Sequence, residues 1–389
     1  MNPKILSIEL TPLHVPFKET VRQLLGESEG GLGMAIPAEE PWLGGDFVIC
    51  KLTADDGNIG IGESFVWLPE TGISPNQIIN VIKHDLFRYI LGESPFNVEK
   101  IRYKMNINVA LNDVSKGLLD MACYDLMGKI TGRPVYDLIG GKTVDEIPLA
   151  ALIPLADPML MRGIARSYYK RGFRTFRLKL GNNIQEDIEI CEKIRQVLSD
   201  EVNLRVDYNQ AYTNPHEAIR AIKAIEPFGI DFAEQPVRNN DYLGLAYVQK
   251  HVDTPLMSHE DFFTLRDFIT LVELKAIGVL GLNSVRPGGV TNALRALDYA
   301  EQRGLGAVIH DQPLGIASAM HIHIATARYY SFTYAAELFV IEMMEDDLIK
   351  IPLNYEGGTA KVPHGPGWGI ELDERAIDKY AVAPSIILK

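Results

Sequence analysis

The second part of the chain repeats one unit, a short apolar extended run followed by an amphipathic helical stretch. Eight extended runs come after Gly140 and Gly141, at residues 147–152, 175–180, 203–208, 231–235, 255–260, 279–285, 307–311 and 334–339. Helical stretches such as 184–198, 215–225 and 290–303 lie between them. Each right-handed strand–helix–strand step places one parallel strand beside the last, so eight strands predict a closed α/β barrel.

The first 140 residues follow a different pattern. Residues 5–15 and two runs within 46–63 are apolar and β-prone, and the Asp55–Asn58 segment between those two runs indicates a hairpin. Three helix-like segments follow, at 75–91, 96–105 and 110–130. We therefore expect an N-terminal α+β capping domain over 1–140 and a catalytic barrel over 141–357. The Gly- and Pro-rich segment 358–389 should pack back on the capping domain.

A Gly-rich stretch over residues 24–45 separates the predicted strands of the capping domain. It is too long for an ordinary connection and is typical of a functional loop. We expect it to act as a lid that excludes water from a bound substrate, with Trp42 among the residues that contact the substrate.

Charge and cysteine content exclude several classes of protein. The chain has 38 Lys and Arg against 51 Asp and Glu, a formal net charge of −13, whereas a nucleic-acid-binding protein needs a basic face. The three cysteines, Cys50, Cys123 and Cys191, are widely spaced and indicate neither a disulfide framework nor a metal-binding pair. No apolar run reaches the length of a membrane span, and the charged N-terminus is unlike a signal peptide. We expect a cytoplasmic protein with no nucleic-acid or membrane partner.

Polar residues stand at or near the ends of most predicted barrel strands. They are Lys179, Asp207, Glu234, Glu260, Asn283 and His310, separated by 28, 27, 26, 23 and 27 residues. Each interval corresponds to one strand and one helix. All six residues should therefore meet at the carboxyl-end face of the barrel, where barrel enzymes have their active sites.

The chemistry of these residues suits a metal-assisted proton transfer. Asp207, Glu234 and Glu260 would offer only oxygen ligands, which Mg²⁺ prefers and which leave positions for substrate oxygens. Asp261 is the alternative to Glu260 if the alignment shifts by one residue. A lysine and a histidine would approach the substrate from opposite sides, which suits abstraction of a proton next to a carboxylate.

These residues lie in motifs that resemble the mandelate racemase branch of the enolase superfamily, within the mandelate racemase/muconate lactonizing enzyme family. The motifs are Arg177-Leu178-Lys179-Leu180-Gly181, Val206-Asp207-Tyr208-Asn209-Gln210, Ala233-Glu234-Gln235-Pro236, His259-Glu260, Gly288-Gly289-Val290-Thr291 and His310. Segments 124–128 and 355–358 extend the similarity over nearly the whole chain.

The resemblance implies a TIM-like barrel, modified to (β/α)7β, and a set of metal ligands and proton carriers. The residues that match the Mg²⁺ ligands are Asp207, Glu234 and Glu260. Lys179 matches the general base, and His310 matches the group that acts on the other face of the substrate.

The resemblance also implies residues that bind the substrate. Arg177 replaces a lysine of the family motif; it keeps a positive charge beside the base and can grip a carboxylate with two hydrogen bonds. Asn209 matches a group that hydrogen-bonds the substrate, and so does Glu337, which lies beyond an apparent insertion. The expected partner is a small carboxylate substrate, and we expect a homo-oligomer.

One position departs from the family pattern. The histidine of the mandelate racemase branch is paired with an aspartate, and the matching residue here is Asn283. An amide can orient an imidazole but cannot stabilise an imidazolium as a carboxylate does. This predicts that His310 is a weaker base and a better proton donor.

That difference favours dehydration of a hydroxylated sugar acid to a 2-keto acid, in which Lys179 abstracts the proton and His310 protonates the departing hydroxyl. The alternative is a racemase, epimerase or cycloisomerase that forms the same intermediate. A non-catalytic barrel is a remote alternative, and an aldolase that uses Lys179 as a Schiff base is disfavoured by Arg177 and the metal carboxylates. The sequence does not name the substrate.

Overall fold

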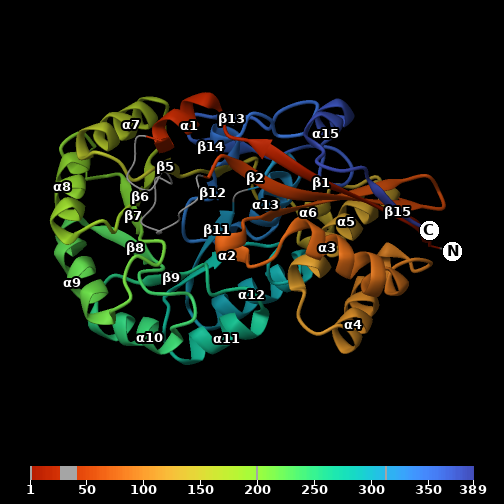
Figure 1. The fold of residues 1–389 in the computed structure, drawn as a ribbon, viewed down its shortest axis with the longest axis horizontal. Helices are drawn as coiled ribbons and strands as arrows, with labels where there is room; N and C mark the ends of the chain where they lie inside the picture. Colours follow the sequence, from red (N-terminus) through yellow and green to blue (C-terminus); the bar gives the residue numbers. More distant parts are fainter. Residues whose placement is uncertain (1, 27–41, 199, 312) are drawn as a thin grey trace.

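The eight predicted parallel strands form a barrel in the computed structural model, which describes residues 2–26, 42–198, 200–311 and 313–389 (Figure 1). The strands run in order around the sheet and are β5 Ala151–Ile153, β6 Thr175–Lys179, β7 Asn203–Asp207, β8 Ile230–Glu234, β9 Leu256–Ser258, β10 Val279–Leu282, β11 Gly306–Asp311 and β12 Glu337–Leu338. A bridge between Leu149 and Ala336 brings the first and last strands together. The predicted barrel is confirmed.

Helices connect successive strands and cover the outside of the barrel (Figure 1). They are α7 Pro158–Lys170, α8 Ile184–Arg195, α9 Pro215–Ile225, α10 Tyr242–His251, α11 Leu265–Glu273, α12 Val290–Gln302 and α13 Gly315–Ala327. Their amphipathic faces account for this position: in α9, for example, Ala218, Ala221, Ile222 and Ile225 are all buried.

The first predicted barrel strand, 147–152, is divided between two sheets. β4 Glu146–Pro148 pairs antiparallel with β14 Thr359–Lys361, which in turn pairs with β13 Tyr355–Glu356. The barrel strand β5 begins only at Ala151. Pro148 explains the break, since it has no N–H with which to continue a ladder.

The N-terminal unit is built on an antiparallel sheet, as the hairpin pattern predicts. β1 Ile5–Pro16, β2 Gly44–Ala54 and β3 Ile59–Val66 lie side by side, and β15 Ile386–Leu388 from the chain end pairs with β1 at the other edge. Helix α5 Asp113–Thr131 packs on this sheet. Two strand glycines allow the close approach, because a Cβ on Gly60 or Gly62 would lie 2.2 Å or 2.6 Å from a backbone oxygen of α5.

The predicted helix over 75–91 changes its winding. α3 Pro75–Val81 continues as a wider π turn, η1 Ile82–Leu86, and then as a 3₁₀ turn, η2 Phe87–Tyr89. Ile78, Ile82, Leu86 and Ile90 are all buried and recur every four residues. A four-residue repeat exceeds the 3.6 residues of an α-helical turn, so the wider turn keeps these side chains on one face.

Shorter elements complete the chain. They are α1 Glu19–Gly26, α2 Leu68–Thr71, η3 Pro95–Asn97, α4 Val98–Asn108, α6 Val135–Ile139, η4 Glu226–Phe228, η5 Tyr329–Ser331, α14 Val340–Met343 and α15 Glu374–Tyr380. Most of the predicted lid, residues 27–41 of 24–45, lies outside the described residues.

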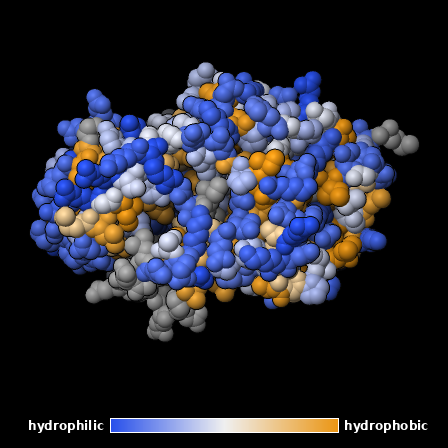
Figure 2. Space-filling model, turned by 90° about the horizontal axis from the view of Figure 1, so that it is seen from above, coloured by the Kyte–Doolittle hydropathy of each residue, from blue (hydrophilic) through white to orange (hydrophobic). Residues whose placement is uncertain are grey.

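Polar residues cover most of the surface seen in Figure 2, and the three cysteines lie in the core. Hydrophilic residues predominate on the face shown in Figure 2, and hydrophobic residues there form separate patches. Within the described ranges no helix is long and apolar enough to cross a membrane. Cys50, Cys123 and Cys191 are free thiols buried in the core.

Glu63 joins the two units. Its buried carboxylate, on β3, accepts hydrogen bonds from the backbone N–H groups of Leu314, Ile316 and Ala317 at 2.6, 3.2 and 3.2 Å. Leu314 is the N-cap residue of α13, and Ile316 and Ala317 lie in its first turn, so a side chain of the capping unit caps a barrel helix. Burial raises the pKa of Glu63 to about 8.

Replacing Glu63 by alanine should destabilise the protein by about 2–4 kcal/mol, because three buried N–H groups lose their acceptor. Urea denaturation followed by circular dichroism measures the change. Glu192→Ala, which removes an exposed glutamate from α8, is the control. Equal stability of the two variants would contradict this account of the contact.

Candidate active site

The strand ends bring the predicted residues to one face of the barrel. Lys179, Asp207 and Glu234 are the last residues of β6, β7 and β8. They are also direct partners in the sheet register, Lys179 with Asp207 and Asp207 with Glu234. All three side chains are buried. The regular spacing in the sequence thus corresponds to adjacent positions in space.

Arg177 lies at the centre of this group. Its Nη2 donates to Asp207 Oδ2 and, at 2.7 Å, to Glu234 Oε2, and its Nε lies 3.3 Å from Glu337 Oε2. Burial opposes the charge of Arg177, but the carboxylates of Asp207, Glu234 and Glu337 outweigh it and raise the pKa of the guanidinium. Its Nη1 has no hydrogen-bond partner among the described residues.

Lys179 donates to the same oxygen of Asp207 as Arg177 does. Its Nζ donates to Asp207 Oδ2 at 2.5 Å and also to Asn209 Oδ1. The Asn209 amide in turn donates to Glu260 Oε1 at 3.0 Å. Asn209, expected to contact substrate, therefore links the predicted base to the third predicted metal ligand.

His310 is paired with Glu337. Nδ1 of His310 contacts Glu337 Oε2, and the two residues are direct partners between β11 and β12. The other Glu337 oxygen lies 2.7 Å from Arg205 Nε. Burial, and next the charge of Arg177, hold the pKa of His310 well below its usual value.

The expected pairing of His310 with Asn283 is wrong. Asn283 instead donates from Nδ2 to Asp311 Oδ1 at 2.9 Å, and its Oδ1 accepts from the backbone N–H groups of Val285 and Arg286. The reason is that Glu337 lies directly beside His310 in the sheet register, within reach of Nδ1. His310 therefore has a carboxylate partner, and the argument for dehydration that rested on an amide partner no longer holds.

Asn283→Asp should therefore destabilise the fold by about 1–3 kcal/mol, because it replaces a buried donor to Asp311 by a second carboxylate. Thermal and urea denaturation at neutral pH measure the loss. The same exchange at the exposed Asn106 on α4 is the control. A more stable Asn283→Asp protein would contradict the observed pairing.

The carboxylates of the three predicted metal ligands differ in how many of their oxygens accept hydrogen bonds from the protein. Both oxygens of Asp207 accept protein hydrogen bonds, Oδ1 from the Asn209 N–H at 2.8 Å and Oδ2 from the two cations. Glu234 Oε1 and Glu260 Oε2 are buried and have no hydrogen-bond partner within the described ranges. Burial, and next the charge of Asp207, raise the pKa of Glu260 to about 8. Unpaired carboxylate oxygens of this kind fit a divalent cation.

Asp261, the alternative third ligand, has hydrogen-bond donors to both of its carboxylate oxygens. Its carboxylate accepts from Gln235 Nε2 at 3.1 Å and from Ser258 Oγ at 3.3 Å. The alternative of Asp261 as the third ligand is therefore disfavoured, since Glu260 and not Asp261 keeps a carboxylate oxygen without a donor among the described residues and is hydrogen-bonded to Asn209 at the site.

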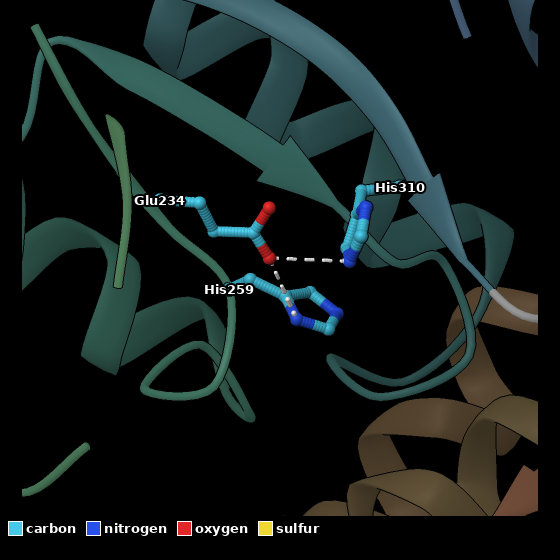
Figure 3. Close-up of side chains that lie close together, drawn as sticks. All are labelled: Glu234, His259 and His310. Atoms are coloured by element: carbon cyan, nitrogen blue, oxygen red, sulfur yellow. Dashed lines mark ion pairs between the residues drawn. The ribbon is translucent and has the colours of Figure 1, made fainter. Parts of the chain in front are cut away.

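Three buried side chains gather more closely than the predicted ligand set. Glu234, His259 and His310 each offer one atom within 4.8 Å of the other two, which no other such group does in the described part of the chain. Figure 3 shows both imidazoles beside one oxygen of Glu234. The His259 and His310 rings also meet edge to face, with centroids 3.9 Å apart.

Two site residues were not found from the sequence. Glu70, on α2 of the capping unit, contacts Arg286 Nη2 and lies 3.3 Å from His259 Nδ1. Arg286 also donates to the His259 backbone oxygen at 3.2 Å. The only sequence signal was the position of Arg286 two residues before Gly288-Gly289; nothing near Glu70 indicates a barrel contact.

Trp42 is the first described residue after the gap at 27–41, and its side chain is buried. Its indole stacks on Trp67 at 4.7 Å between ring centroids and meets the edge of Phe17 at 4.8 Å. Trp67 precedes α2, which carries Glu70. A substrate contact by Trp42 stays a prediction.

The chain is similar to known proteins over most of its length. Residues 44–140 match the family described as the mandelate racemase / muconate lactonizing enzyme N-terminal domain, and residues 160–376 match enolase C-terminal domain-like proteins. N-succinyl-L-Arg/Lys racemase of Bacillus cereus is 29% identical over 344 residues, 87% of this chain and 91% of that protein. Its crystal structure superposes with a TM-score of 0.89 at 27% identity, covering 99% of this chain and 100% of that one.

Two epimerases extend the comparison. A hydrophobic dipeptide epimerase of Enterococcus faecalis is 31% identical over 330 residues, 83% of this chain and 87% of that protein. A dipeptide epimerase of Cytophaga hutchinsonii, solved with Mg and the dipeptide D-Ala-L-Val, shares the fold with a TM-score of 0.85 at 23% identity, covering 99% and 100% of the two chains. These relatives are isomerases and do not support dehydration of a sugar acid, the reaction favoured from Asn283.

Proposed function

We infer that this chain, which belongs to the mandelate racemase/muconate lactonizing enzyme family of the enolase superfamily, racemises or epimerises the carbon next to a carboxylate. The names of its relatives suggest the substrate class. An N-succinyl amino acid and a dipeptide both carry an acylated nitrogen and a carboxylate on an amino-acid unit. We propose a small acylated amino acid or dipeptide as the substrate.

The observation that carries the proposal is the presence of two proton carriers in one buried carboxylate site. Lys179 comes from β6 and His310 from β11, and both approach the group formed by Arg177, Asp207 and Glu234. Inversion at carbon requires that a proton leave on one face and return on the other. A lysine and an imidazole at different strands can perform these two steps.

The environment of each group defines its role. Lys179 Nζ would take the proton from the carbon on one face. Glu337 holds Nδ1 of His310, which fixes the ring and leaves Nε2 as the nitrogen that exchanges a proton on the other face. Arg177 Nη1, which has no hydrogen-bond partner in the part of the chain that the structure describes, is available to a substrate carboxylate.

A divalent cation completes the proposed site. Asp207, Glu234 and Glu260 would hold Mg²⁺, for which the unpaired oxygens of Glu234 and Glu260 provide acceptors. The cation supplies positive charge that stabilises the extra negative charge of the substrate carboxylate after the proton has left.

The proposal is tested with the wild-type protein and added Mg²⁺, on a panel of acylated amino acids, dipeptides and hydroxylated sugar acids. Chiral chromatography should show conversion of one enantiomer or diastereomer into the other for at least one acylated amino acid or dipeptide. Release of a 2-keto acid from a hydroxylated substrate, without inversion of any acylated amino acid or dipeptide, would contradict the proposal and restore dehydration.

A further inference from the structure

Three carboxylate oxygens surround one nitrogen of His259. Nδ1 lies 3.3 Å from Glu70 Oε1, 3.5 Å from Glu234 Oε1 and 3.8 Å from Glu260 Oε2. His259 lies on the loop that follows β9, and Figure 3 shows its ring turned toward the Glu234 carboxylate. All four side chains are nine-tenths or more buried.

Hydrogen bonds from the described residues do not pair all the polar atoms of His259 and the carboxylates around it. A single N–H on Nδ1 can be donated well to only one of the three oxygens. Glu70 already contacts Arg286, whereas among the residues that the structure describes Glu234 Oε1, Glu260 Oε2 and His259 Nε2 have no hydrogen-bond partner. Buried acceptors left unpaired are costly, so two carboxylate oxygens beside an imidazole nitrogen indicate a missing positive charge.

We propose that His259 is a nitrogen ligand of the divalent cation, beside Glu234 and Glu260. The proposal rests on the cation of the proposed function and adds a ligand of a different chemical kind. Mg²⁺ prefers oxygen, whereas imidazole nitrogen favours first-row transition ions such as Mn²⁺ and Co²⁺. The chain should therefore bind Mn²⁺ in preference to Mg²⁺ by a margin that depends on His259.

His310 provides the matched comparison within the same site. Its Nε2 lies 3.3 Å from the same Glu234 oxygen, but the proposed function assigns it to proton transfer. A measurement that detects a nitrogen bound to the metal must therefore distinguish the two histidines.

The full-length protein is loaded with Mn²⁺ and examined by electron spin-echo envelope modulation, with and without ¹⁵N-labelled histidine. We expect modulation from a directly bound imidazole nitrogen in the wild type. It should be lost in both His259→Asp and His259→Gln and retained in His310→Asn. The preference for Mn²⁺ over Mg²⁺, measured by competition calorimetry, should fall on the order of tenfold in His259→Asp.

Absence of nitrogen modulation in the wild type, or modulation that survives both His259 variants, would overturn the proposal. Loss in His310→Asn alone would overturn it too, by assigning the nitrogen to His310. The same experiments distinguish failure of this ligand assignment from failure of the proposed function. Isomerisation without a bound nitrogen refutes only the ligand, and a bound nitrogen without isomerisation of any substrate refutes only the function.

Discussion

Lys179→Ala is expected to slow isomerisation by about 10²- to 10⁴-fold, the usual effect of removing a positioned acid or base. Lys179 Nζ reaches both Asp207 and Asn209 inside the site, so alanine removes the only amine in this cluster of contacts. The loss should fall mainly on kcat, because the substrate contacts proposed for Arg177 and the cation remain.

Steady-state rates of inversion measure this effect. Lys170→Ala, which removes an exposed lysine at the end of α7, is the control and should keep the wild-type rate. A Lys179→Ala protein as active as the control would exclude Lys179 as a proton carrier.

Arg177→Met should lower the free energy of unfolding by about 3–5 kcal/mol, because removing one partner of a buried ion pair leaves the other uncompensated. Arg177 is 1% exposed and contacts the carboxylates of Asp207, Glu234 and Glu337. Arg177→Lys should cost less, since it keeps the charge but loses the planar fork that reaches more than one carboxylate.

Urea denaturation of the two variants measures these losses. Arg166→Met, at an exposed position on α7, is the control for removal of an arginine. If Arg177→Met were as stable as that control, the guanidinium would not be what stabilises the carboxylates of the site.

The regular part of the site was predictable from the sequence. The spacing of Lys179, Asp207 and Glu234 equals one strand and one helix, and the parallel register then makes them neighbours. A repeated unit of this kind converts distance along the chain into position in space, which is why the barrel and these residues could be located from one sequence.

The irregular part was not predictable. Glu337, the partner of His310, lies on β12, a strand of only two residues that follows an apparent insertion. The sequence spacing therefore does not predict that it lies beside β11. Glu70 reaches Arg286 across 216 residues, from a different structural unit. The winding change at 82–86 follows from the burial of Ile82 and Leu86 on one face, which local helix propensity does not describe.

The same irregularity decides between the two candidate reactions. The family pattern places Asn283 beside His310, and that pairing favours dehydration. In the structure Asn283 binds Asp311 and Glu337 binds His310. A carboxylate on Nδ1 makes the histidine suitable for two-way proton transfer, which agrees with isomerisation.

The central claim is that Lys179 and His310 act on opposite faces of one carbon. The most direct measurement is incorporation of deuterium from D₂O at that carbon, followed by NMR for each pure enantiomer of a substrate that the wild type inverts. The wild type should exchange both enantiomers. Lys179→Ala should retain exchange of one enantiomer only and His310→Asn of the other only. Loss of exchange of the same enantiomer in both variants, or full exchange of both enantiomers in either variant, would contradict the account.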